Sequence, residues 1–324
     1  MIITRTPYRI SLFGGGTDYP AFYEKHGGAC LTTTIDKFCH VLIRKMPPFL
    51  GSKYRLFWSR AETVDSIDDI QHPGVRGCLQ YLQIEDGIEM NHAGDLPARS
   101  GLGSSSAFVV GMLHALHVLN GCKPSREQLA AQAINVEQNL LKETVGIQDQ
   151  IQCAWGGMNV IRIDKTGSYM VEPIPIDLDR QRWIEDHLLL VFTGLQRNAS
   201  EIAKVQVDNI GKKEQELLAI KELVDIAMKT VKEADVEQLG RLLHETWMLK
   251  RGLTDKITTD QLDDVYDIAR KHGAWGGKVL GAGGGGFFLF CSPPQAHTKI
   301  TEALGLISMP VRFEHSGSQV VLAT

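Results

Sequence analysis

The sequence predicts an α+β protein of two domains. Three observations support this prediction: strand-like segments fill the first 60 residues, helical segments dominate the second half, and strands return only near the end. A chain of 324 residues is long enough for two ordinary domains. We expect the boundary near residue 180, which divides the chain into domains of 1–180 and 181–324.

The first domain is expected to be a mixed sheet covered by helices. Runs of β-branched and aromatic residues, separated by Pro and Gly, predict strands over 9–13, 30–35 and 40–44. Apolar residues at helical spacing predict helices over 104–119 and 126–142, because Gly121 and Pro124 interrupt the pattern between them. Two further strands, over 156–163 and 170–174, complete this domain.

The second domain is expected to be mainly helical. The charged run 177–186 is interpreted as a loop at the boundary, and a strand follows over 187–193. Amphipathic patterns predict helices over 200–232, 236–251 and 261–272. Strands are expected again over 287–291 and near Val311 and Val320.

Composition indicates a soluble globular protein. The chain is 43% hydrophobic and 22% charged with a net charge of -4, so it has no basic excess that would favour nucleic acid as a partner. It lacks an N-terminal leader pattern and any apolar run long enough to span a bilayer, so we expect no membrane association and a cytoplasmic location. Its 6 cysteines show no C-x-x-C pair, which favours reduced thiols and argues against a structural zinc.

The segment from Pro97 to Ala107, PARSGLGSSSA, predicts a phosphate-binding loop. Gly101 and Gly103 lack a Cβ, so backbone N–H groups there can approach an anion. The helix expected to begin near Ser104 would direct the positive end of its dipole at the same point. The serine hydroxyls can cap that helix or bind a divalent cation.

Two more glycine clusters lie at Gly14–Gly16 and Gly281–Gly286. No lysine follows Gly103, so the Walker P-loop pattern is absent. In the cluster at 281–286, the spacing of Gly281, Gly283 and Gly286 matches G-x-G-x-x-G. The strand-like FFLF follows it instead of a helix, which argues against dinucleotide binding. A tight turn remains the alternative, although four consecutive glycines favour close backbone approach to a ligand.

Three segments together resemble the motifs of the GHMP small-molecule kinases: PYRISLFGGGTDY (7–19), PARSGLGSSSA (97–107) and KVLGAGGGGF (278–287). They occur in the family's order and span nearly the whole chain. The resemblance implies an N-terminal domain like the second domain of ribosomal protein S5, a ferredoxin-like C-terminal domain, and ATP with Mg²⁺ as cofactors. The ATP-binding residues it implies are Pro97, Arg99, Ser100, Gly101, Leu102, Gly103, Ser104, Ser105 and Ser106.

The resemblance also implies catalytic and metal-binding residues. Asp149, in VGIQDQ, resembles the catalytic aspartate that accepts the proton of the attacking sugar hydroxyl, and Arg9 resembles the arginine that pairs with it. Ser105 and Glu137 resemble the Mg²⁺ ligands, since both supply oxygen. The alternatives are that Glu137 is a solvated carboxylate on a helix face and that Asp149 is a turn or capping residue.

The residues implied for the sugar are those of the first motif, together with part of the third and one arginine. Where galactokinase has G-E-H-T-D, this chain has Gly-Gly-Gly-Thr-Asp, which keeps a carboxylate but opens space for a different or larger sugar. A phosphate on the sugar would need a cation, for which Arg197 is the first candidate and Arg99 the second; Arg197 could instead be a structural loop residue. The complete set is Gly14, Gly15, Gly16, Thr17, Asp18, Arg197, Gly283 and Gly284.

Within the family, the segments GIQDQ, WGGMNVI and LLLVFTGLQRNASEI resemble bacterial sugar-1-kinases that act on D-glycero-D-manno-heptose 7-phosphate. That resemblance implies transfer of the ATP γ-phosphoryl group to the anomeric hydroxyl, giving the 1,7-bisphosphate used for nucleotide-activated heptose. L-Fucose or another sugar is the alternative acceptor. A non-catalytic sensor of sugar and ATP, or a diphosphate decarboxylase, are rival classes, and a homo-oligomer is left open.

Overall fold

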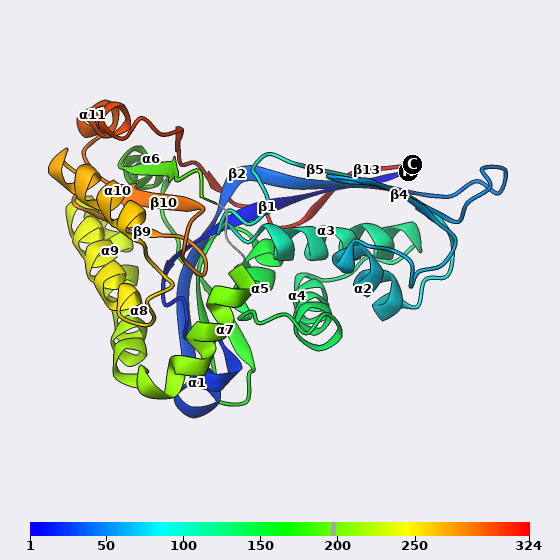
Figure 1. The fold of residues 1–324 in the computed structure, drawn as a ribbon, viewed down its shortest axis with the longest axis horizontal. Helices are drawn as coiled ribbons and strands as arrows, with labels where there is room; N and C mark the ends of the chain where they lie inside the picture. Colours follow the sequence, from blue (N-terminus) through cyan, green and yellow to red (C-terminus); the bar gives the residue numbers. More distant parts are fainter. Residues whose placement is uncertain (196–198) are drawn as a thin grey trace.

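A computed structural model describes residues 1–195 and 199–324, and in these ranges the chain forms two β-sheets with helices packed on them (Figure 1). The larger sheet comprises β1 (Ile2–Phe13), β2 (Gly28–Lys45), β3 (Tyr54–Phe57), β4 (Ala61–Val64), β5 (Ile88–Gly94), β6 (Met158–Ile163), β7 (Tyr169–Pro173), β12 (Phe313–Glu314) and β13 (Gln319–Ala323). The smaller sheet comprises β8 (Leu188–Phe192), β9 (Gly276–Val279), β10 (Phe287–Cys291) and β11 (Ser308–Pro310), in the antiparallel order β11-β8-β10-β9.

Eleven α-helices are found in the described ranges. Those before the smaller sheet are α1 (Pro20–His26), α2 (Pro73–Leu82), α3 (Ser104–Leu119), α4 (Arg126–Asn135), α5 (Gln148–Trp155) and α6 (Leu178–Asp186). Those that follow are α7 (Ala199–Asn209), α8 (Glu214–Glu233), α9 (Val236–Arg251), α10 (Asp260–Lys271) and α11 (Pro294–Leu304). The predicted α+β class is confirmed.

The long strand β2 organises the larger sheet. It pairs with β1 along most of its length, while its other edge pairs first with β6 and then with β5. Helix α3 is apolar on nearly all sides and packs against β1 and β2, so it forms the centre of the core beneath the sheet (Figure 1). The main hydrophobic cluster also includes Leu239 of α9 and Leu280, so the two halves of the chain share one core.

The end of the chain returns to the first sheet. Strand β13 pairs with β1, with Ile2 opposite Ala323, and β12 pairs with β2. The boundary predicted near residue 180 falls in α6, between the strands of the two sheets. A division there would assign residues 313–323 to the second domain by sequence, although their strands pair with the larger, N-terminal sheet. The two-domain boundary stays a prediction.

Three predicted elements differ from the structure. The run 177–186 is a helix and not a loop, because the Asp177 side chain caps it by accepting from the Arg180 N–H at 2.9 Å. The helix predicted over 200–232 is interrupted by a 3₁₀ turn at Ile210–Lys212, which separates α7 from α8. The helix predicted over 126–142 ends at Asn135 and continues as a π-helical turn over Val136–Leu140.

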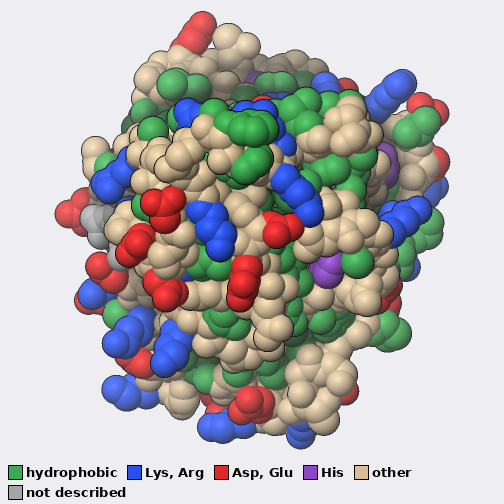
Figure 2. Space-filling model, turned by 90° about the vertical axis from the view of Figure 1, so that its right-hand side faces the viewer, with side chains coloured by type: hydrophobic (Ala, Val, Ile, Leu, Met, Phe, Trp, Pro, Cys, Tyr) green, Lys and Arg blue, Asp and Glu red, His purple; other side chains and the backbone are tan. Residues whose placement is uncertain are grey.

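Charged side chains are mixed on the face shown in Figure 2, where Lys and Arg alternate with Asp and Glu and no patch has one sign. Among the described residues, no helix is both long and apolar enough to cross a membrane.

Candidate functional site

A cavity of about 410 Å³ lies where the two halves of the chain meet. Its walls come from β1, the loops that precede α3 and α5, the helix α7, and the C-terminal residues around Lys250, Lys278 and Gly281. Segments that are far apart in the sequence therefore contribute to a single site.

The predicted phosphate loop forms one wall of this cavity. Helix α3 begins at Ser104, and Gly101 and Gly103 adopt φ angles of 80° and 72°, a region that favours glycine. A Cβ on Gly101 would lie 2.5 Å from the Leu280 carbonyl oxygen, and one on Gly103 would lie 3.0 Å from Cγ of Arg9. These glycines therefore allow the loop to fit between β1 and the C-terminal half.

The predicted ATP-binding residues divide into two groups. Those at the cavity wall are Arg99, Gly101, Gly103, Ser104, Ser105 and Ser106. Pro97, Ser100 and Leu102 are not among the lining residues. Leu102 is buried in the core and its carbonyl accepts from the Arg9 N–H at 3.0 Å, while the Ser100 carbonyl accepts from the Phe287 N–H at 3.2 Å. Ser100 and Leu102 thus help to hold the loop in place.

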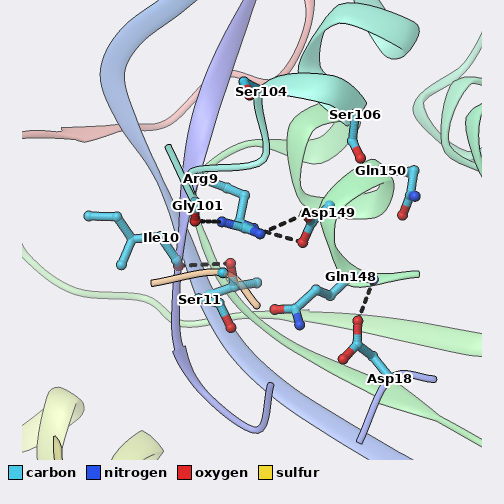
Figure 3. A network of polar contacts seen from close by, with 12 residues as sticks. Arg9, Ile10, Ser11, Asp18, Gly101, Ser104, Ser106, Gln148, Asp149 and Gln150 are labelled. Atoms are coloured by element: carbon cyan, nitrogen blue, oxygen red, sulfur yellow. Dashed lines mark hydrogen bonds and ion pairs between the residues drawn. The ribbon is translucent and has the colours of Figure 1, made fainter. Parts of the chain in front are cut away.

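Arg9 and Asp149, which both line the cavity, form a bidentate ion pair (Figure 3). Arg9 donates from Nε to Oδ1 at 2.7 Å and from Nη2 to Oδ2 at 2.6 Å, and its Nη1 donates to the Gly101 carbonyl at 2.7 Å. Burial opposes the charge of Arg9, but the Asp149 carboxylate outweighs it and raises the pKa of Arg9. The pair therefore joins β1, the phosphate loop and the first turn of α5.

Asp18 lines the cavity on the opposite side of the Arg9–Asp149 pair from Ser104 (Figure 3) and is 3% exposed. Its carboxylate accepts from the Gly16 N–H at 3.1 Å and from the Gln148 N–H at 3.4 Å. Burial, and then the charge of Asp149, raise the pKa of Asp18. Gly146 makes room for it, because a Cβ there would lie only 1.8 Å from Oδ2 of Asp18.

The other residues of the first motif have different positions. Gly15 and Gly16 line the cavity beside Asp18. Gly14 and Thr17 are not among the lining residues: the Thr17 hydroxyl donates to the Gly14 carbonyl at 2.8 Å, and a Cβ on Gly14 would lie 1.9 Å from the Ala29 carbonyl oxygen. Gly14 and Thr17 thus shape the turn that presents Gly15, Gly16 and Asp18.

Glu137 is fully buried in the π-helical turn, so it is not a solvated residue on a helix face. Its Oε2 accepts from the Ser106 hydroxyl at 2.8 Å and from Gln150, and its Oε1 is buried without a hydrogen-bond partner among the described residues. Burial, and then the charge of Glu143, raise its pKa to about 7. Ser105, the predicted companion of Glu137, is exposed on the same turn of α3, so Ser106 is the serine that contacts Glu137.

The glycine cluster Gly281–Gly286 packs tightly against neighbouring backbone. A Cβ on Gly281 would lie 2.6 Å from Cα of Gly101, and one on Gly286 would lie 2.4 Å from the Ser100 carbonyl oxygen. Of this loop, Gly281 and Ala282 line the cavity, whereas Gly283, predicted to bind substrate, packs on Ile257, and Gly284 donates to the Ile257 carbonyl at 2.8 Å. The close approach inferred from the four glycines is therefore made largely to the protein itself.

Two buried lysines of the cavity wall were not predicted from the sequence. Lys250 is 5% exposed and donates to the carbonyls of Val279 and Gly281, while Lys278 is 2% exposed and donates to the carbonyls of Ser11 and Leu12 at 2.9 and 3.0 Å. Burial lowers the pKa of Lys250 to about 8 and that of Lys278 well below its usual value.

The end of the cavity beyond the phosphate loop is aromatic. The ring of Phe108 lies 4.5 Å from that of His72 and 5.0 Å from that of His92, measured between centroids. Burial, and then His92, lower the pKa of His72 to about 4, so His72 is neutral at pH 7. This end therefore offers flat, uncharged surfaces.

Arg197, predicted to bind a sugar phosphate, lies outside the described residues. Ser200, Ala203 and Gln206 of α7, the helix that follows it, line the cavity. His114 and His117 lie on the same helix but bond to different residues. His114 contacts Ser318, and His117 contacts Gln132.

Comparison with known families gives two matches. The family described as "GHMP kinases N terminal domain" matches residues 74–157, and "GHMP kinases C terminal" matches residues 227–305. The first range contains the phosphate loop, Glu137 and Asp149, and the second contains both buried lysines.

Similar proteins include sugar kinases. A D-glycero-alpha-D-manno-heptose 7-phosphate kinase of Campylobacter jejuni is 27% identical over 94% of this chain and 93% of its own length. An L-fucokinase/L-fucose-1-P guanylyltransferase of Bacteroides fragilis is 23% identical over 93% of this chain but only 35% of its own length. A crystal structure described as a D-glycero-D-manno-heptose 1-phosphate kinase of Bacteroides thetaiotaomicron superposes over the full length of both chains, with a TM-score of 0.82 at 22% identity.

Proposed function

We propose that this chain, which belongs to the GHMP kinase family, phosphorylates the C1 hydroxyl of D-glycero-D-manno-heptose 7-phosphate and so forms the 1,7-bisphosphate. It is a sugar kinase, a phosphotransferase that acts on a sugar hydroxyl. The C. jejuni relative supports the choice of sugar. The observation that carries the proposal is the position of the Arg9–Asp149 pair, between the phosphate loop and Asp18.

The cavity suggests how the two substrates bind. GHMP kinases use ATP, whose phosphates would lie on the backbone N–H groups of the phosphate loop at the start of α3. Its base would occupy the aromatic end near His72 and Phe108. The sugar would then lie at the opposite end, where Asp18 can accept hydrogen bonds from its hydroxyls.

Asp149 is placed to act as general base. It is 26% exposed, so one face of its carboxylate is open to the cavity while both oxygens are oriented by Arg9. The hydroxyl of the sugar would give its proton to Asp149 as its oxygen attacks the γ-phosphorus, and the bond from that phosphorus to the bridging oxygen of ADP would break. Arg9 would offset the negative charge on the phosphoryl group during transfer.

The residues present fit a Mg²⁺ ion. The hydroxyls of Ser105 and Ser106 are hard oxygen donors at the wall where the phosphates would lie, and Glu137, buried behind Ser106, has an Oε1 with no partner among the described residues. Mg²⁺ usually takes one or two carboxylates and completes its shell with phosphates and water, so this small set suffices. When bound, the ion would neutralise charge on the phosphates.

ADP release from MgATP tests the proposal. We expect turnover with D-glycero-D-manno-heptose 7-phosphate and not with L-fucose, galactose or unphosphorylated heptose, assayed in parallel. The product should lose its reducing end, because the anomeric hydroxyl is esterified. Turnover with phosphorylated heptose but a product that still reduces alkaline copper would contradict phosphorylation at C1.

L-Fucose is the alternative acceptor, favoured by the B. fragilis relative. It carries no phosphate, so turnover with fucose and none with heptose 7-phosphate would replace the proposed substrate within the same family. Binding of sugar and ATP without any ADP release would instead indicate a sensor. The intact Arg9–Asp149 pair argues against that class.

A further inference from the structure

We propose that the ammonium groups of Lys250 and Lys278 form the subsite for the phosphate that the sugar substrate already carries. The inference rests on the proposed function, because it identifies how this cavity would distinguish a sugar phosphate from a free sugar.

Each ammonium group has one N–H that the described residues do not use. An ammonium has three donors. Two of those on Lys250 go to the carbonyls of Val279 and Gly281, and two of those on Lys278 go to the carbonyls of Ser11 and Leu12. Both side chains line the cavity, so the remaining donors are available to a ligand there.

The charge around these lysines is unbalanced. Arg9 is paired with Asp149, whereas within the described residues no carboxylate forms an ion pair with Lys250 or Lys278, and Asp18 acts on Lys250 only from beyond ion-pair distance. Burial, and then the positive charges of Lys250 and Arg9, lower the pKa of Lys278, so the three cations also repel one another. A buried cation without a counter-ion is costly, and an anionic ligand would supply the missing charge.

The position of Lys278 favours the phosphate of the sugar over the phosphoryl group in transfer, and Lys250, held at Gly281, lies within reach of the charges of both Arg9 and Asp18. The carbonyls that hold Lys278 belong to residues two and three positions beyond Arg9 on β1, which is about 7–10 Å along the strand toward Gly14. That is the sugar end of the cavity, where Gly15 and Asp18 lie. The phosphate loop and Arg9 already serve the transferred group.

The same end contains two buried polar atoms that the described residues leave without a hydrogen-bond partner. Ser11 Oγ and Gln148 Oε1 are buried and have no hydrogen-bond partner in the part of the chain that the structure describes, although both residues line the cavity. A Cβ on Gly15 would lie 3.3 Å from Ser11 Oγ and 3.8 Å from Gln148 Nε2, so these groups surround the open space at Gly15. Figure 3 shows the Gln148 side chain extending toward Ser11. Buried polar atoms are usually paired, which indicates that the substrate completes this site.

The test compares how strongly each protein prefers the phosphorylated sugar. Isothermal titration gives the Kd of heptose 7-phosphate and of free heptose for the wild type, Lys250→Met and Lys278→Met, and the ratio of the two Kd values measures the contribution of the phosphate. In the wild type, we expect the phosphate to strengthen binding of the sugar about 10- to 100-fold per lysine. Each variant should lose that factor, while its Kd values for free heptose and for ADP should change less than about threefold.

Lys221→Met is the matched control. Lys221 is half-buried and donates to the His26 carbonyl, but it is not a residue of the cavity wall, so its loss should leave the ratio unchanged. An unchanged ratio in Lys250→Met and Lys278→Met would overturn the proposal. An equal loss of affinity for ADP would also overturn it, because the lysines would then serve the nucleotide or the transferred group.

A second measurement uses the wild type, in case a variant fails to fold. Acetylation of lysines by acetic anhydride, followed by mass spectrometry, should show Lys250 and Lys278 protected by heptose 7-phosphate and not by free heptose. Equal protection by both sugars would contradict the proposal. These results are independent of ADP release, so the proposed activity could fail while the phosphate subsite is demonstrated, or the reverse.

Discussion

Gly146→Ala should selectively impair sugar binding. The added Cβ would lie 1.8 Å from Oδ2 and 2.4 Å from Cγ of Asp18, and the backbone of Gly146 is not in the left-handed region, so the effect is a collision and not strain. The carboxylate must move by more than 1 Å to reach an ordinary contact distance of roughly 3 Å or more, which breaks its hydrogen bond from the Gln148 N–H.

The expected magnitudes follow from that displacement. Overpacking of this kind lowers the free energy of unfolding by about 1–3 kcal/mol. Loss of a hydrogen bond between a charged carboxylate and the sugar would raise the KM of the sugar about 10- to 100-fold. The KM of ATP should change little, because the atoms nearest to the added Cβ belong to Asp18 and not to the phosphate loop.

Steady-state ADP release with each substrate varied, and urea unfolding, measure these effects. Gly211→Ala is the control, since a Cβ at Gly211 has no neighbour within 4 Å. An unchanged KM for the sugar would refute the placement of Asp18 in the sugar site. Equal increases in both KM values would refute the selectivity.

Three other outcomes are expected. Asp149→Asn should fold and bind ATP but lose about 10²- to 10⁴-fold in kcat, and near wild-type turnover would mean that Asp149 only orients the sugar. Glu137 has a pKa raised from 4.5 to about 7, so the folded protein keeps a proton that the unfolded chain releases. The free energy of unfolding of the ligand-free protein should therefore fall by about 3 kcal/mol as pH rises from 4.5 to 7. Glu137→Gln should remove most of that fall in urea unfolding at pH 5 and 8, and an equally steep profile in the variant would assign it to another group. Gly103→Ala should lower kcat/KM for ATP, since its Cβ would lie 3.0 Å from Cγ of Arg9 and its φ is 72°; unchanged kinetics would show that the loop tolerates a side chain.

Local sequence signals predicted the regular elements well where start and stop signals were strong. Helices α3 and α9 and strand β10 have the predicted bounds. The charged segment of α6 was misread because its only buried apolar residue is Ile184, which is too little for a helical period. The interruption at Ile210–Lys212 was missed because the amphipathic pattern continues across it.

The site could be predicted only in part. Arg9 and Asp149 are 140 positions apart, so no local pattern joins them, and their pairing was inferred through the family resemblance. Ser106 contacts Glu137, which the sequence did not indicate, and the role of Ser105 as a Mg²⁺ ligand stays a prediction. Lys250 was missed although it follows Leu243 and Trp247 on the buried face of α9, a spacing that could have revealed it.

The pairing of β13 with β1 has a consequence for synthesis on the ribosome. Residues 319–323 emerge more than three hundred positions after Ile2–Arg5, the segment they cover. Until then that edge of β1 is an open strand that other chains can join. A nascent or truncated chain that lacks β13 should therefore depend on chaperones and aggregate more readily than a chain that contains it.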